Sequence, residues 1–78
     1  MIIKFKNIQD FQKRIILLGF TVRGFAISSG ISTPYMSQIV NGKRNPSPQM
    51  AKRVCEGLNA EFDDIFFIED DNKSYQTA

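Results

Sequence analysis

Residues 21–42 read TVRGFAISSGISTPYMSQIVNG, and this stretch decides how the rest of the chain is organised. Thr21 and Ser32 each precede a short helical pattern, where a side-chain hydroxyl can accept a hydrogen bond from an amide of the first turn. Gly30 stands between the two patterns and suits a turn with positive φ, while Gly42 suits the end of the second helix. The stretch therefore predicts two short helices joined by a tight turn, a helix-turn-helix.

Hydrophobic residues support both predicted helix starts. Phe20 precedes the first cap and Phe25 lies four residues after it, and Ile31 and Met36 repeat this pairing around the second cap. Met36 and Ile39 are three residues apart, so both are expected to point inward and hold the second helix against the first. The opposite face of that helix has small polar groups and no acid, which suits either a plain solvated surface or entry into a groove lined by phosphates.

The order and spacing of residues over 8–66 resemble the DNA-binding domains of the lambda-repressor and Cro type, the XRE-like family. The matching residues in the central stretch are Thr21, Phe25, Ala26, Gly30, Ile31, Ser32, Met36, Ser37, Ile39, Asn41, Gly42 and Lys43. The likeness continues through Asn45, Pro46, Ser47, Val54 and Leu58 to the segment Phe62, Asp63, Asp64, Ile65, Phe66.

The resemblance implies a mainly α fold, a five-helix lambda-repressor-like domain. It also implies a function: a sequence-specific regulator of transcription, a repressor, that binds a pseudo-palindromic operator in double-stranded DNA as a homodimer. The third helix would be the recognition helix, with its N-terminal part in the major groove. The alternative is an antitoxin or anti-regulator that uses this fold chiefly to bind another protein. Antitoxins of this family often bind DNA as well, so the two functions overlap.

The resemblance also marks the residues expected to read bases. They are Thr33, Pro34 and Gln38, with Ser37 and Tyr35 beside them. Gln38 is the strongest candidate for direct readout, because a side-chain amide can bond to adenine N6 and N7 together. Pro34 can make only apolar contact, for example with a thymine methyl group.

A second set of residues is expected to contact phosphates and so to position the protein without specifying a sequence. These residues are Thr21, Arg23, Asn41, Lys43 and Arg44. Many relatives carry Gln at the start of the second helix, where this chain has Val22. The side chain of Val22 has no polar group for the phosphate bond usual at that position.

The remaining elements follow from local patterns. We predict a strand over 1–5, helices over 8–18, 22–28, 33–40, 48–58 and 61–65, and a second strand over 66–68. Ile8, Phe11, Ile15 and Leu18 form the apolar stripe of the first helix. Residues 1–69 would then be one domain in which the terminal strands pair antiparallel, and 70–78 a polar, flexible tail.

The end of the predicted domain is also the expected dimer interface. Phe66, Phe67 and Ile68 are more apolar than so small a domain needs for its own core. A single domain makes few base contacts, and dimers read half-sites about one helical turn apart. We therefore expect a homodimer assembled around these residues.

Charge is distributed unevenly along the chain. The net charge is +2, but residues 1–56 hold nine Lys and Arg against Asp10 and Glu56, whereas residues 57–78 hold Lys73 against six acids. A basic body with an acidic end is suited to one face turned towards polyanionic DNA, although a solvated surface with a charged tail has the same composition.

The composition argues against several other classes of protein. With no His and no phosphate-binding glycine motif, we expect no catalytic residues, no metal site and no cofactor. Cys55 is expected to be a small core residue, because there is no His to activate it. No apolar run is long enough for a signal peptide or a membrane span, and a single Cys fits a reducing compartment, so we expect a cytoplasmic protein.

Overall fold

The computed structural model describes residues 1–70, which form five helices and a two-stranded sheet. In chain order the elements are β1 (Ile2–Phe5), α1 (Ile8–Leu17), α2 (Val22–Ser29), α3 (Thr33–Val40), α4 (Pro48–Leu58), α5 (Phe62–Ile65) and β2 (Phe66–Glu69). The predicted mainly α fold with a small sheet is confirmed. The tail predicted over 70–78 lies, apart from Asp70, outside the described residues.

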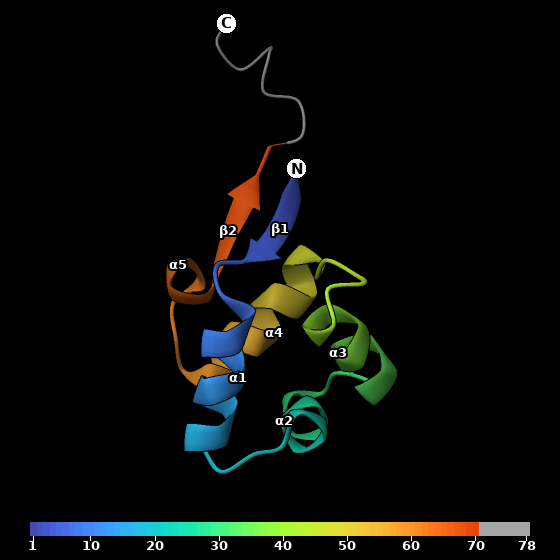
Figure 1. Ribbon diagram of the computed structural model, residues 1–78, viewed down its shortest axis with the longest axis vertical. Coiled ribbons are helices and arrows are strands. Elements are labelled where there is room, and N and C mark those ends of the chain that lie inside the picture. Colours follow the sequence, from blue (N-terminus) through green and yellow to red (C-terminus); the bar gives the residue numbers. More distant parts are fainter. Residues whose placement is uncertain (71–78) are drawn as a thin grey trace, which may run out of the picture.

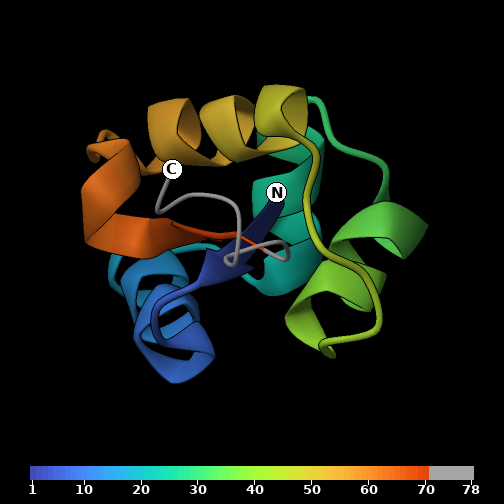
Figure 2. The ribbon, with the colours of Figure 1, turned by 90° about the horizontal axis from the view of Figure 1, so that it is seen from above.

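The helices gather at one end of the molecule, and the sheet projects from them (Figure 1). In Figures 1 and 2, α1 and α3 lie on opposite sides, with α2 and α4 between them. The helix-turn-helix formed by α2 and α3 therefore occupies one side of the domain. Among residues 1–70, no helix is both long and apolar enough to cross a membrane.

The two strands come from opposite ends of the described chain and pair antiparallel, as predicted. Ile2 pairs with Glu69, and the register runs through to Phe5 opposite Phe66. An ion pair between Lys4 Nζ and Glu69 Oε1, 2.8 Å apart, lies across the two strands. The sheet thus ties the start of the domain to its end.

Side-chain caps begin the helices where the sequence predicts them. Thr21 Oγ1 accepts from the backbone N–H of Gly24 at 3.0 Å, and Ser32 Oγ accepts from that of Tyr35 at 3.3 Å. Asn7 caps α1 and Ser47 caps α4 in the same way. Each cap satisfies an amide that the helix itself leaves without a partner, so these boundaries are set locally.

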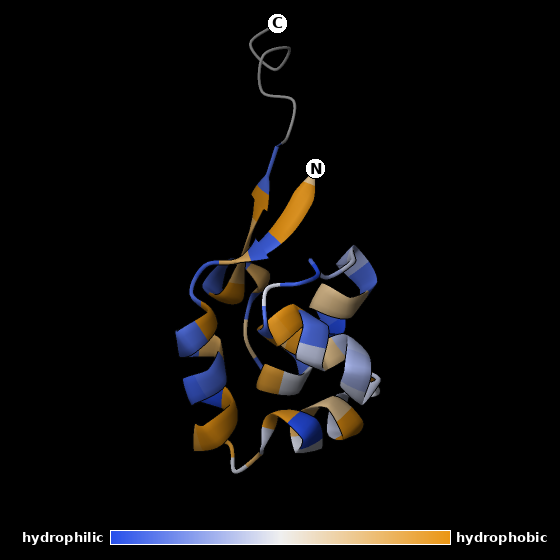
Figure 3. Ribbon diagram, turned by 45° about the vertical axis from the view of Figure 1, so that its right-hand side comes forward, coloured by the Kyte–Doolittle hydropathy of each residue, from blue (hydrophilic) through white to orange (hydrophobic). Residues whose placement is uncertain are grey.

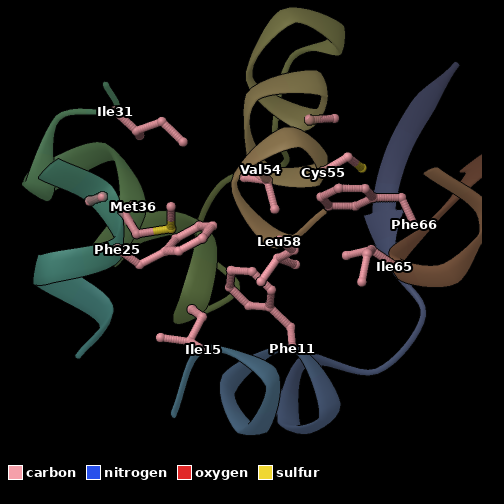
Figure 4. Packing of buried hydrophobic residues seen from close by; sticks show 12 residues of the cluster. Phe11, Ile15, Phe25, Ile31, Met36, Val54, Cys55, Leu58, Ile65 and Phe66 are labelled. Carbon is pink, nitrogen blue, oxygen red and sulfur yellow. The ribbon is translucent and has the colours of Figure 1, made fainter. Parts of the chain in front are cut away.

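The core is a single cluster built around aromatic rings (Figure 4). The Phe25 ring lies 6.0 Å from that of Phe11 and 5.9 Å from that of Phe20, both edge to face. Phe66 is 0% exposed and its ring lies 4.7 Å from that of Phe5. Its inclusion in the expected dimer interface is therefore wrong. The next two residues of β2, Phe67 and Ile68, are exposed.

The end of α1 departs from the expected apolar stripe. Phe11 and Ile15 are buried, but Leu18 is exposed, as are Ile16 and Leu17. The helix ends at Leu17, and Gly19 then turns the chain with a φ of +87°. Leu18 is therefore the C-cap of α1, where the chain leaves the helix.

The packing of α4 against α2 explains why a glycine occupies position 57. It lies inside α4, where glycine is about 1 kcal/mol less favourable than alanine. A Cβ at this position would lie 2.5 Å from Ser29 Oγ and 3.0 Å from two atoms of the Phe25 ring. The missing side chain thus lets α4 approach α2 closely.

Cys55 is buried, as expected for a small core residue. Burial raises the pKa of its thiol, and the nearby charges of Asp64, Glu61 and Glu56 raise it further. A raised pKa keeps the group as a neutral thiol at physiological pH, which is the unreactive form.

Candidate nucleic-acid interface

One face of α3, the predicted recognition helix, packs against the rest of the protein, and its opposite face is exposed. Met36 and Ile39 are buried and anchor α3 in the molecule. Pro34, Ser37 and Gln38 are exposed, and Thr33 is half-buried. The side of the molecule that carries α3 comes forward in Figure 3, where the first turn of this helix carries no strongly hydrophobic residue. The structure thus brings four of the five predicted base readers to one outer surface.

Tyr35, the fifth predicted base reader, has a different position. It is half-buried against the core, and its hydroxyl accepts from the backbone N–H of Ser47 at 3.1 Å. The guanidinium carbon of Arg44 lies 4.7 Å from the centroid of its ring. These contacts make Tyr35 a fixed support between α3 and the start of α4.

Two predicted site residues on different segments contact each other. Arg44 Nη1 donates to Gln38 Oε1 at 3.4 Å, from the loop that follows α3 back to the exposed face of that helix. Asn41, the C-cap of α3, donates from Nδ2 to Ser37 Oγ at 3.3 Å. The loop after α3 therefore lies against the side chains expected to read bases, which the sequence alone does not show.

The remaining predicted phosphate contacts lie at the ends of the two helices. Thr21 and Arg23 are exposed at the start of α2. Lys43 is exposed just beyond α3, where its backbone N–H donates to the carbonyl of Gln38 at 2.9 Å and Gly42 turns the chain with a φ of +74°. Exposed donors at such positions can contact a DNA backbone on either side of a helix that lies in a groove.

Electrostatics favour an anionic partner at this surface. No Asp or Glu occurs between Asp10 and Glu56. The seven basic residues in that interval are Lys13, Arg14, Arg23, Lys43, Arg44, Lys52 and Arg53. The acids of the described chain beyond Glu56 are Glu61, Asp63, Asp64, Glu69 and Asp70, on or beside α5 and β2. The helix-turn-helix therefore contains no side chain that repels phosphate.

One residue that supports this motif was missed by sequence reasoning. Arg53 lies on α4, and its Nη1 donates to the carbonyl of Gly30 at 2.8 Å. Gly30 has a φ of +73°, and it is the turn residue between α2 and α3. The arginine of α4 thus fixes the turn from a position 23 residues along the chain. No local pattern in the sequence could reveal this contact.

Comparison with known proteins agrees with this geometry. A family model described as a helix-turn-helix matches residues 12–65, more than half of the chain. Over 52 residues the chain is 36% identical to the HTH-type transcriptional regulator SlrR of Bacillus subtilis (strain 168), covering 65% of this chain and 34% of that protein. The chain thus spans about a third of that relative's length. No solved structure matches. The match covers both helices, their turn and the helices packed around them, and the chain belongs to the XRE-like helix-turn-helix family.

Proposed function

We propose that this protein is a sequence-specific regulator of transcription, a repressor, that binds a pseudo-palindromic operator in double-stranded DNA as a homodimer. One observation carries the proposal. The exposed face of α3 presents Pro34, Ser37 and Gln38, while buried Met36 and Ile39 hold that helix in place. The bacterial relative is a transcriptional regulator by name, which supports the same proposal. In this proposal α3 enters the major groove and Thr33 joins the base readers.

Selection from random duplex DNA at physiological salt tests whether the protein binds DNA and prefers a sequence. Gln38→Ala should then weaken binding to the selected site by about 1–3 kcal/mol, the range for loss of one good base contact. Binding to random duplex should change little, because Gln38 carries no charge. The affinities of the wild-type and variant proteins for both duplexes, measured under the same conditions, give the change in binding free energy for each duplex.

Lys43→Ala is the matched variant, because Lys43 is expected to contribute to the affinity for DNA but not to the choice of sequence. It should weaken binding to the selected site and to random duplex alike, because a phosphate contact carries no sequence information. It should also flatten the plot of log affinity against log salt concentration by about one unit, since one counterion fewer is released. If Gln38→Ala weakened both duplexes equally while Lys43→Ala changed the preferred bases, the proposed docking of α3 would be wrong.

The proposed homodimer would form around the exposed apolar residues of β2. Phe67 and Ile68 are 40% and 55% exposed, and each strand of a two-stranded sheet leaves one edge unpaired. Phe67→Ser should therefore weaken self-association while the fold remains, because this ring lies outside the core. Sedimentation at tens of micromolar, with and without an operator duplex, measures the effect. A wild-type protein that stayed monomeric in both conditions would rule the homodimer out.

A further inference from the structure

A chain of contacts leads from the start of α4 to the tip of Gln38. The hydroxyl of Tyr35 accepts from the backbone N–H of Ser47 at 3.1 Å, so the ring is held both by α3 and by the N-cap of α4. The guanidinium of Arg44 lies over that ring, 4.7 Å from its centroid. Its Nη1 then donates to Gln38 Oε1 at 3.4 Å. The exposed arginine is therefore placed by a fixed aromatic surface.

This contact favours one of the two orientations of the Gln38 side-chain amide, which differ by an exchange of Oε1 and Nε2. With Oε1 turned towards a positively charged donor, the two N–H donors of Nε2 face the other way. The amide then presents donors to a partner, and the guanidinium beside it adds further donors and a positive charge. The pair formed by Gln38 and Arg44 thus prefers a partner that offers acceptors only.

We propose that Arg44 is a positioning residue that acts through Gln38 and makes it favour guanine over adenine. This inference rests on the proposed function, because it concerns which base α3 reads. In the major groove guanine offers two acceptors, N7 and O6, whereas adenine offers the acceptor N7 beside the donor N6. A glutamine without this neighbour uses its oxygen to accept from adenine N6, but here that oxygen faces Arg44 and N6 would meet a second donor.

The conservative variant Arg44→Lys separates positioning from charge. Lysine keeps the positive charge, but it lacks the planar guanidinium that lies on the ring and donates to the amide in a fixed direction. Preferred sites should be selected for the wild-type protein, Arg44→Lys, Gln38→Ala, the double variant, and Lys43→Ala as the control. The position read by Gln38 is the one whose preference disappears in Gln38→Ala. Thermal unfolding checks that each variant is folded, as expected because Arg44 is exposed.

At that position the wild-type protein should prefer guanine. Arg44→Lys should move the preference towards adenine by about tenfold, within the discrimination expected of one base contact. The salt dependence of binding should stay as in the wild-type protein, because the charge is kept. In the Gln38→Ala background Arg44→Lys should change no base preference, since Arg44 acts through the amide. In the free protein, the NMR signals of the Gln38 side-chain amide should shift in Arg44→Lys and not in Lys43→Ala.

Several results would overturn the inference. One is a wild-type preference for adenine at this position, and another is an unchanged preference in Arg44→Lys. A third is the same change of preference with and without Gln38, which would mean that Arg44 reads the base itself. A wild-type protein with no sequence preference at all would overturn the proposed function together with the inference. A wild-type protein that selects a clear site, read identically by Arg44→Lys, would overturn the inference alone.

Discussion

Phe25→Ala is expected to lower the free energy of unfolding by about 3–5 kcal/mol, the usual cost of removing a buried phenylalanine ring. Phe25 is 0% exposed, and its ring contacts those of Phe11 and Phe20. Small domains are stable by only about 5–15 kcal/mol in total, and one of this size belongs near the lower end. The variant should therefore be largely unfolded at physiological temperature. Urea denaturation followed by circular dichroism measures the loss.

Ile27→Ala is the control for this prediction. Ile27 lies in the same helix but is 65% exposed, so its truncation leaves no cavity. Its free energy of unfolding should stay within about 0.5 kcal/mol of the wild-type value. Equal unfolding midpoints for Phe25→Ala and Ile27→Ala would show that the ring cluster is not the centre of the core.

Gly57→Val should destabilise the fold by about 3 kcal/mol, at the upper end of the range for overpacking. In an unconstrained helix, replacing glycine would instead be stabilising. Here the new Cβ would meet Ser29 Oγ at 2.5 Å and the Phe25 ring at 3.0 Å, and both lie on α2. Valine adds two methyl groups beyond that Cβ, so α2 and α4 must move apart. The same denaturation experiment gives the change.

Ser29→Ala tests whether this contact is the cause. Ser29 Oγ is buried and has no hydrogen-bond partner within residues 1–70, so its removal alone should cost little. Combined with Gly57→Val it should restore part of the lost stability, because the nearest obstructing atom is gone. The Phe25 ring still limits the rescue. Strictly additive effects of the two substitutions would contradict a direct contact between these positions.

Local chemistry made much of the fold predictable from the sequence. Thr21, Ser32 and Ser47 cap helices with their own side chains, so residues next to each boundary determine where α2, α3 and α4 begin. The strands were predictable because short β-branched and aromatic runs occur at each end of the domain. Most of the predicted base-reading residues lie on one face of α3, because helical spacing alone places them together.

Contacts between distant segments were not predictable. The approach at Gly57 depends on Phe25 and Ser29, which belong to another helix. The sequence suggests that Tyr35 lies on the surface of α3, but its hydroxyl accepts a hydrogen bond at the start of α4. Arg44 looked like a charge that only meets phosphate, because six residues separate it from Gln38 and no helical period relates them. In each case the deciding partner is set by tertiary packing.

The pairing of the terminal strands bears on the order in which the protein folds. Direct contact between Phe5 and Phe66 in an otherwise unfolded chain closes a very long loop, at an entropic cost of about 3–4 kcal/mol by the logarithmic rule. The contacts within α2, α3 and α4 span far fewer residues, and local contacts form sooner. Once those helices pack, they carry the two ends towards each other and most of the closure is already complete. We therefore expect the sheet to form late in folding, after the helices between its strands have packed.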